Sequence, residues 1–293
     1  MKGPIEMSIK QSVHDSYKAT RPRKRLPVTS TGFVGSSLRD ALGNLGDILK
    51  FSGTVVRQLP EVRKYGTEVL HQAGILILSS GLIIWGMQFV IGTMCATEAS
   101  YTLKQVGAPI YSGVFTAYCG FREMSPYMWG YIFAAKIGCG LVAEIGSMRI
   151  AEEIDAMEVM GVPSRPYLVG TRILAAWIAI PFLFTVGLGI TYIAMYLVTV
   201  VQLANVSSGG YLYIFWAYQN PLDFFFVQLR VLSYGTVVVF VSCYYGYTAS
   251  GGSVGVGRAT AKSMMLNMVL IHLCGVVTSQ AFWGLQPNAP ISN

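Results

Sequence analysis

Charged side chains are scarce in this chain of 293 residues, and their scarcity excludes an ordinary soluble protein. Asp, Glu, Lys and Arg make up 12% of the residues and hydrophobic residues 53%, whereas soluble domains carry about 25% charged residues. The mean hydropathy is +0.51. No gap between the apolar runs is large enough for a separate soluble domain of about 100 residues. We therefore predict an integral membrane protein, and any energy-converting domain must belong to another polypeptide.

Residue patterns that build catalytic or metal sites are also missing. The five cysteines form no Cys-x-x-Cys pair, and His14, His71 and His272 lie far apart in the sequence, which argues against a zinc site and a disulfide framework. The glycine-rich run 251–257 lacks the Lys-Ser or Lys-Thr ending of a phosphate-binding loop. We therefore predict a non-catalytic chain that holds no metal and no cofactor of its own.

Apolar stretches predict about five transmembrane helices in an all-α fold. Four stretches are uninterrupted and cover about 73–96, 173–200, 224–247 and 264–283. The remaining stretch, 108–144, is nearly twice as long as one span, and Arg122, Glu123 and Pro126 interrupt it. We therefore expect a short half-inserted segment there, followed by one full span.

Positive charge is concentrated near the N-terminus. Residues 1–72 hold twelve Lys or Arg and six Asp or Glu, whereas residues 73–293 hold nine and eight. By the positive-inside rule the N-terminus is cytoplasmic, and five crossings then place the C-terminus on the extracytoplasmic side. Because the basic segment precedes membrane spans and has no base-reading module behind it, we expect no nucleic-acid partner.

The first 72 residues divide into two parts by composition. Residues 1–31 are rich in Pro, Ser, Thr and Lys, which favours a disordered basic arm in the cytoplasm. Further on, apolar residues recur at helical spacing, so we expect an amphipathic interfacial helix within 32–72 that Pro60 ends, followed by an elbow. Residues 73–284 form the predicted transmembrane permease domain, and residues 285–293 a tail outside the cytoplasm.

Several ionisable residues lie within or beside the apolar stretches, where a charge is costly unless it is paired or faces a wet cavity. They are Glu98, Arg122, Glu123, Lys136, Glu144, Asp223 and Arg230. For four of them a structural explanation is as good as a functional one: Glu98, Glu144 and Asp223 can lie at the membrane interface, and Lys136 can extend its ammonium group toward water. Arg122, Glu123 and Arg230 are therefore our candidates for a lipid cavity, where they would face the headgroup of an amphiphile.

An acidic amphipathic segment, 145–162, separates two apolar stretches. Its apolar residues Met148, Ala151, Ile154 and Met157 recur at spacing three, and Glu152, Asp155 and Glu158 form a parallel acidic stripe that Glu153 joins. This pattern predicts a helix of about 147–160 that Gly161 and Pro163 end. A plain surface loop is the alternative, but acids facing the cytoplasm favour a protein partner with a basic surface.

The same segment carries a resemblance to a known family. Residues 143–161 and 167–175 resemble the signature loop of MlaE/YrbE permeases, the membrane subunits of MCE-associated lipid ABC transporters. The run 121–126, Phe-Arg-Glu-Met-Ser-Pro, resembles the family's Leu-Arg-Glu-Leu-Gly-Pro, and Gly246-Tyr247 with 255–260 resembles its last cytoplasmic loop. The resemblance covers roughly residues 33–284.

This resemblance implies a permease subunit that moves lipids between the bacterial inner membrane and a tunnel of MCE proteins, with ATP and Mg²⁺ bound by a separate cytoplasmic ABC ATPase. It implies that a cytoplasmic coupling helix docks into the ATPase. The candidate ATPase-coupling residues are Arg149, Glu152, Glu153, Asp155 and Glu158. The pair Glu152-Glu153 departs from the family's usual Glu-Gln, which adds a negative charge.

The long basic arm resembles the actinobacterial YrbE branch. That resemblance implies a heterodimer with a second, paralogous permease rather than a homodimer, beneath an MCE hexamer, and lipids of the fatty acid, mycolic acid or sterol class. The alternative function is an ion-coupled secondary transporter of an amphiphilic substrate, with Glu98 or Glu144 in a proton relay. Inverted repeats, which are frequent in that class, are not visible in the sequence.

Overall fold

We describe the fold from a computed structural model of the chain. It describes residues 30–284, and side chains from residue 43 onward. The chain divides into two compact units, 1–47 and 48–293. In the first unit, residues 30–47 are helical and belong to α2 (Ser30–Gln58). Residues 1–29 of the predicted arm and the predicted tail 285–293 lie outside the described residues.

Every described element of the second unit is helical, and several short π-helical and 3-10 segments (labelled η) join the α-helices. The first half contains η1 (Leu59–Tyr65), α3 (Gly66–Gln105), η2 (Pro109–Tyr111), α4 (Ser112–Phe115), η3 (Thr116–Met124), α5 (Ser125–Phe133), η4 (Ala134–Gly138) and α6 (Cys139–Ile150). The second half contains α7 (Glu153–Val159), η5 (Pro166–Gly170), α8 (Thr171–Tyr196), η6 (Leu197–Gln202), α9 (Ser208–Ala217), α10 (Pro221–Tyr247) and α11 (Gly252–Trp283).

Within residues 30–284, five helical runs are long and apolar enough to cross a membrane. They are Gly43–Gln105, Pro109–Ile150, Pro166–Gln202, Pro221–Tyr247 and Gly252–Trp283. Each run contains one of the stretches from which we predicted a span, and no strand occurs in this part of the chain. The prediction of an all-α integral membrane protein with five spans is confirmed.

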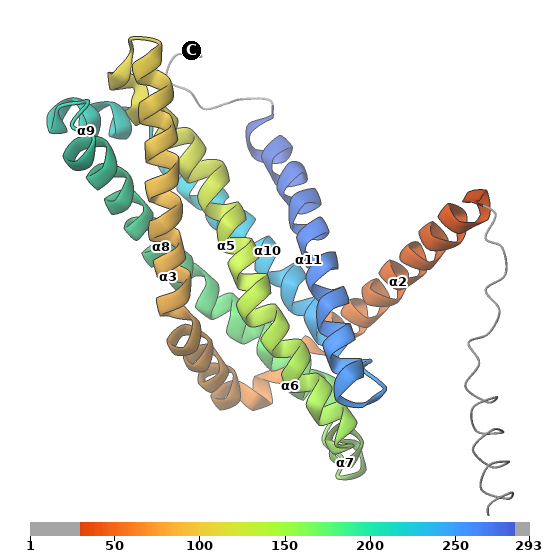
Figure 1. The fold of residues 1–293 in the computed structure, drawn as a ribbon. Helices are drawn as coiled ribbons and strands as arrows, with labels where there is room; N and C mark the ends of the chain where they lie inside the picture. The colour runs from red at the N-terminus through yellow and green to blue at the C-terminus, as the bar shows by residue number, and fades with distance from the viewer. Residues whose placement is uncertain (1–29, 285–293) are drawn as a thin grey trace, which may run out of the picture. The chain divides into compact units, whose positions relative to one another are not determined.

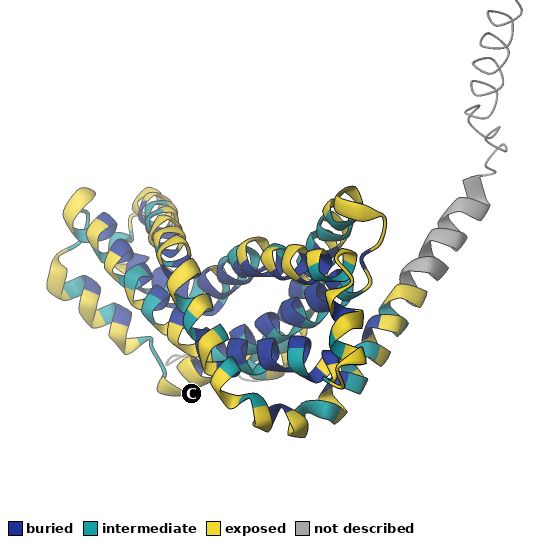
Figure 2. Ribbon diagram, turned by 90° about the horizontal axis from the view of Figure 1, so that it is seen from below, coloured by how far each residue is buried: buried dark blue, intermediate teal, exposed yellow. Residues whose placement is uncertain are grey.

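Helix α10 is the central helix of the second unit. It packs against α5, α6, α8 and α11, while α3 packs along α8 (Figure 1). Buried residues occupy the helix faces that are turned toward one another, and exposed residues the outer faces (Figure 2). Large apolar side chains such as Leu78 (86% exposed) and Leu82 (83% exposed) lie on the outer face of α3. An apolar outer face is what a helix in contact with lipid tails requires.

The contact between α3 and α8 depends on a glycine. A Cβ atom at Gly92 would lie 2.7 Å from the carbonyl oxygen of Thr191 and 2.8 Å from Cβ of Ala194. Because lipid provides no hydrophobic drive for helix association, membrane helices gain contact energy by this kind of close backbone approach. Gly92 therefore lets α3 and α8 pack closely.

The stretch 108–144 differs from the prediction of a half-inserted segment followed by a separate span. The structure has one unbroken helical run, Pro109–Ile150, that contains two π-helical segments, η3 and η4. Pro126 is the second residue of α5, which follows η3, and the wider turns of a π-helix accommodate local disruption of the hydrogen-bond ladder. The charges of Arg122 and Glu123 do not interrupt the helix because other helices supply partners for them, as described below.

The acidic segment also differs from its prediction. Instead of one helix over 147–160, residues 147–150 end α6, and α7 begins only at Glu153. Glu152 between them has a left-handed backbone (φ 59°), which breaks the helix. The predicted end is confirmed: Gly161 has φ +78°, and the N–H groups of Gly161 and Val162 donate to the carbonyl oxygens of Glu158 and Met157. This is a Schellman motif.

Candidate functional site

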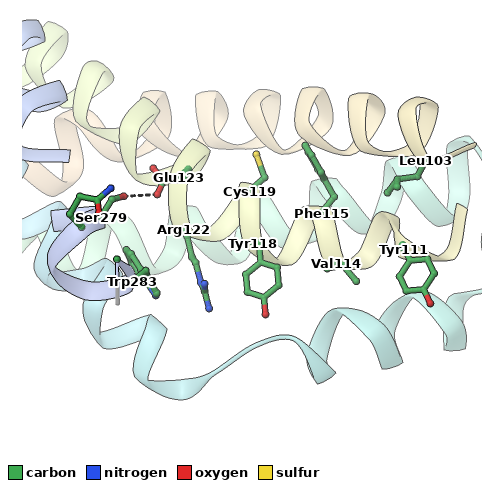
Figure 3. A pocket seen from close by; sticks show the side chains of 12 residues that line it. Leu103, Tyr111, Val114, Phe115, Tyr118, Cys119, Arg122, Glu123, Ser279 and Trp283 are labelled. Atoms are coloured by element: carbon green, nitrogen blue, oxygen red, sulfur yellow. Dashed lines mark hydrogen bonds between the residues drawn. The ribbon is translucent and has the colours of Figure 1, made fainter. Parts of the chain in front are cut away.

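A cavity of about 810 Å³ lies at the end of the second unit where α3 and α11 end. Its walls are mainly apolar and aromatic, and its charged lining residues are Arg122 and Glu123 (Figure 3). The lining residues are Leu103, Tyr111, Val114, Phe115, Tyr118, Cys119, Arg122, Glu123, Ser279, Gln280, Trp283 and Gly284. A long apolar wall with a few convergent polar groups at one end is the usual form of a site for an amphiphile.

Glu123 is held at the cavity wall by Arg230, which is fully buried in α10. The two Arg230 Nη atoms donate to the two carboxylate oxygens of Glu123, at 3.0 and 2.8 Å. Arg230 also donates to the carbonyl oxygen of Arg122 at 2.6 Å, to that of Gly275 at 3.2 Å and to the hydroxyl of Tyr234 at 2.7 Å. All five N–H donors of the guanidinium are therefore satisfied, which a buried charge requires.

Arg122 has its own partner on α10. It forms an ion pair with Asp223, which is 1% exposed, and its Nε lies 3.1 Å from the Oδ2 atom of that residue. Trp283 on α11 donates its indole N–H to Oδ1 of Asp223 at 2.8 Å. Asp223 is placed by the start of α10, where Asn220 caps the helix by accepting from the N–H of Leu222.

Aromatic rings surround both guanidinium groups. The Cζ atom of Arg122 lies 4.3 Å from the ring centre of Tyr118, and that of Arg230 lies 4.8 Å from the ring centre of Tyr127. Ring faces stabilise cations where water is excluded. The side chain of Glu123 is 43% exposed, and its carboxylate accepts a hydrogen bond from the hydroxyl of Ser279 at 2.7 Å. The cavity therefore offers polar contacts at one end of an apolar wall.

The opposite end of the second unit carries α7, between the end of α6 and the start of α8 (Figure 1). Ile154 is fully buried, and Met148 and Met157 pack against the hydrophobic core, so the predicted apolar face is directed inward at these three positions. The acids Glu152, Glu153, Asp155 and Glu158 are exposed. Arg149 pairs with Asp155 at 2.6 Å, which leaves Glu152 and Glu153 as exposed acids with no ion pair among the described residues.

Glu158 connects the loop after α7 to the end of α10. It accepts from the hydroxyl of Ser164 at 2.6 Å and from that of Tyr247 at 3.2 Å, and the two hydroxyls lie 3.0 Å apart. Arg165 lies over the ring of Tyr247, at 5.9 Å from its centre. Helix α10 therefore contacts the α7 region at one end and carries Asp223 and Arg230 near its other end.

Comparison with known proteins places this architecture in a family. The family model described as Permease MlaE matches residues 69–281, which include the cavity residues Arg122 and Glu123, helix α7 and all of α10. The chain belongs to the MlaE permease family. This confirms the family resemblance inferred from the sequence, while the actinobacterial branch stays a prediction.

Relatives of this MlaE permease come from bacteria and plastids. A probable ABC transporter permease protein of Rickettsia bellii is 33% identical over 162 residues, which are 55% of this chain and 62% of that protein. A probable ABC transporter permease protein of Rickettsia conorii is 26% identical over 240 residues, 82% of this chain and 92% of that protein. The Arabidopsis thaliana protein TRIGALACTOSYLDIACYLGLYCEROL 1, chloroplastic, is 27% identical over 166 residues, 55% and 46% of the two chains. The chain thus spans about three fifths of the length of the first of these relatives.

The structure of this MlaE permease brings the three predicted cavity residues together. Arg122 and Glu123 line the cavity, and Arg230 lies behind Glu123. The other ionisable candidates are elsewhere. Glu98 and Lys136 are exposed, and Glu144 pairs with Arg172 at 2.5 Å near the α7 end. Within the described residues, His, Cys, Asp and Glu side chains form no group of three that could hold a metal ion.

Sequence reasoning left open whether Asp223 is a functional residue or lies at the membrane interface; the MlaE permease buries it as the partner of Arg122. A signal for this role was present. Asp223 and Arg230 are seven residues apart, which is about two turns and therefore one face of a helix. Asp223 is opposite in charge to Arg122, and Arg230 is opposite in charge to Glu123. One face of α10 could therefore pair with both residues. Only the packing of α10 against the run 109–150 decides the pairing.

Proposed function

We propose that this MlaE-family chain is the transmembrane permease subunit of an ATP-driven transporter that moves lipids out of or into the bacterial inner membrane. The observation that carries the proposal is the position of α10. One helix connects a cavity with apolar walls and charged residues to the region of the acidic α7, at opposite ends of the second unit. Such a permease needs a rigid element that joins the lipid-binding site to the surface on which the ATPase docks.

The shape and chemistry of the cavity support a lipid as cargo. Acyl chains fit against Leu103, Val114 and Phe115, and a polar headgroup fits near Arg122 and Glu123, whose charges are already paired within the protein. The name of one relative contains that of a glycerolipid. For this chain we propose lipids of the fatty acid, mycolic acid or sterol class.

The exposed acids of α7 support a cytoplasmic ABC ATPase as partner, because relatives are named ABC transporter permeases and this chain has no nucleotide-binding loop of its own. ATP and Mg²⁺ would be bound by that ATPase. When the ATPase subunits close, they move α7, and the contacts of Glu158 with Ser164 and Tyr247 pass the movement to α10. Asp223 and Arg230 then shift at the cavity.

The remaining partners follow from the resemblance stated above. We propose that the chain pairs with a second, paralogous permease, as in the actinobacterial YrbE branch that its basic arm resembles, and that the pair delivers lipid to an MCE hexamer. The N-terminus then lies in the cytoplasm, in agreement with the excess of Lys and Arg in residues 1–72. The C-terminus lies on the other side of the membrane.

The ATPase assignment is tested by charge reversal at Glu152 and Asp155. The double variant Glu152→Lys, Asp155→Lys should lose co-purification of the ATPase, because acids that meet basic residues in an interface become repulsive when reversed. The matched control is Glu61→Lys, since Glu61 is an exposed acid of η1, which packs beside η5 at the same end of the second unit. Undiminished co-purification and transport by the double variant contradicts the proposal and leaves an ion-coupled transporter as the better candidate.

The lipid assignment is tested by filling the cavity. Val114→Trp places a large ring in the cavity wall, and we expect less lipid in the purified complex, measured by lipid mass spectrometry. The matched control is Leu82→Trp, because Leu82 is 83% exposed and lies on the outer face of α3. Unchanged lipid content and identity in Val114→Trp would show that this cavity does not hold the cargo.

A further inference from the structure

A second cavity lies near the α7 end of the second unit and shares no lining residue with the larger cavity described above, which we call the cargo cavity. Its volume is about 180 Å³, and residues of α3, η4, α6, α8 and α10 line it. Three lining residues are charged: Lys136, Glu144 and Arg172. Two cations against one carboxylate give this small cavity a net positive charge, in contrast to the paired charges of the larger one.

Arg172 is the buried member of this group. It is 6% exposed, its Nη1 donates to the carbonyl oxygen of Leu168 at 2.8 Å, and its Nη2 donates to Glu144 at 2.5 Å. Its Nε has no hydrogen-bond partner among the described residues. An unsatisfied buried donor of a charged group is unfavourable and rare in native structures. Each Nη atom carries a second N–H group that has no hydrogen-bond partner among the described residues, so Arg172 has donors available to a ligand in the cavity.

Lys136 supplies the second cation. Its side chain is exposed and makes no ion pair or hydrogen bond within the part of the chain that the structure describes. The hydroxyl of Ser80, which is 1% exposed, and that of Ser79 lie 3.4 Å apart in the same lining. Ammonium, guanidinium and hydroxyl donors around one small volume are the groups that bind phosphate oxygens.

Two of the charged lining residues lie near helix ends on the side of α7. Glu144 lies six residues before the end of α6, and Arg172 is the second residue of α8. At 1.5 Å per residue both lie within about 10 Å of these helix ends, and Lys136 lies deeper, about 21 Å from the end of α6, within reach of a headgroup only through its long side chain. An apolar stripe begins at the cavity residue Ile75 (45% exposed) and continues along α3 through Leu78 and Leu82. Acyl chains of a lipid seated here would follow this stripe.

We propose that this cavity binds the phosphate group of a membrane lipid from the leaflet that faces α7. Arg172 and Lys136 donate to phosphate oxygens, and Glu144, whose side chain is 51% exposed, faces an ammonium or hydroxyl group of the same headgroup. The site is separate from the cargo cavity, and the proposal holds for any function of the larger cavity. A soluble phosphate offers the same oxygens, so the experiment distinguishes the two sources.

The experiment compares lipids with and without phosphate on the full chain. Native mass spectrometry in detergent counts the bound molecules of dioleoylphosphatidylglycerol and of dioleoylglycerol, for the unmodified chain and for Lys136→Gln. We expect Lys136→Gln to weaken binding of the phospholipid about tenfold, the effect of one lost charge-assisted hydrogen bond. Lys136→Arg should restore it. Lys136 is exposed, so its replacement leaves the fold intact, whereas replacing Arg172 would disturb the core.

Two controls separate the possible outcomes. Lys104→Gln removes an exposed cation at the opposite end of α3, where Lys104 donates to Asn205, and should not change the count. Val114→Trp fills the cargo cavity and should leave this phospholipid bound, even if the proposed transport function is wrong. Equal binding of the two lipids, or an equal loss in Lys104→Gln, overturns the proposal. Inorganic phosphate binding that depends on Lys136, with lipid binding unchanged, overturns the lipid as its source.

Discussion

The charged residues beside the large cavity and those of α7 differ in burial and in pairing. At the cavity end, Arg230 and Asp223 are 0% and 1% exposed, and each has hydrogen-bond partners on other helices. At the α7 end, Glu152 and Glu153 are exposed and have no ion pair among the described residues. Buried paired charges hold helices in position, whereas exposed unpaired acids are available to a partner. The two ends should therefore respond differently to the same kind of mutation.

The largest effect is expected at Arg230. Arg230→Leu removes five hydrogen bonds and leaves the carboxylate of Glu123 without its cation, so the free energy of unfolding should fall by about 3 kcal/mol, the lower part of the range for a broken buried pair. Glu123 is half exposed, which limits the loss. Thermal unfolding in detergent measures the effect. The double variant Arg230→Leu, Glu123→Leu should recover part of the stability, and a single variant as stable as the parent would contradict the scaffold role.

A smaller loss is expected at Asp223. Asp223→Asn keeps the shape but removes the carboxylate charge that faces Arg122, and we expect a loss of about 2 kcal/mol by the same measurement. Trp283→Phe keeps a ring and removes only the N–H that donates to Asp223, which should cost about 1 kcal/mol. If the two variants were equally destabilised, the charge of Asp223 would contribute nothing beyond its hydrogen bonds.

At the α7 end, backbone conformation should matter more for stability than charge. Gly161→Ala places a side chain at φ +78°, which we expect to cost about 1 kcal/mol and to loosen the end of α7. Gly74→Ala is the matched control, because Gly74 is helical and a Cβ atom there meets nothing within 4 Å. Faster hydrogen exchange at residues 157–162 in Gly161→Ala alone would confirm the role of the Schellman motif.

The smallest effect is expected at Glu153. This residue is exposed and has no ion pair in the described part of the chain, so Glu153→Gln should leave the melting temperature unchanged. The same variant should weaken binding of the ATPase if α7 is the docking helix. If Glu153→Gln lost stability but still bound the ATPase, this acid would have a structural role like that of the buried charges at the cavity end.

Length and hydropathy were enough to predict the five spans, because a bilayer sets the length of an apolar helix independently of its neighbours. They were not enough for the stretch 109–150. There the cost of Arg122 and Glu123 predicted a break, and the pairing with Asp223 and Arg230, about 100 residues further along the chain, removes that cost. Long-range pairs of this kind leave no local pattern.

The boundaries of α7 show the same limit. Of the predicted apolar positions, Met148, Ile154 and Met157 face inward but Ala151 is exposed, and Gly161 identified the end of the helix. Nothing local predicts the left-handed backbone of Glu152, since non-glycine residues rarely adopt it. The small cavity at Arg172 was also missed, because a single basic residue at the start of an apolar stretch gives no sign that Lys136, 36 residues earlier, lines the same space.

Arg230 donates hydrogen bonds to main-chain carbonyl groups, which affects how well this protein tolerates substitutions at the acceptor positions. The carbonyl oxygens of Arg122 and Gly275 remain acceptors whichever amino acids occupy those positions. Crowding restricts position 275 separately, since a Cβ atom there would lie 2.1 Å from the hydroxyl of Tyr127. The two main-chain acceptors therefore survive substitution at 122, whereas any replacement of Arg230 removes the donors for both of them.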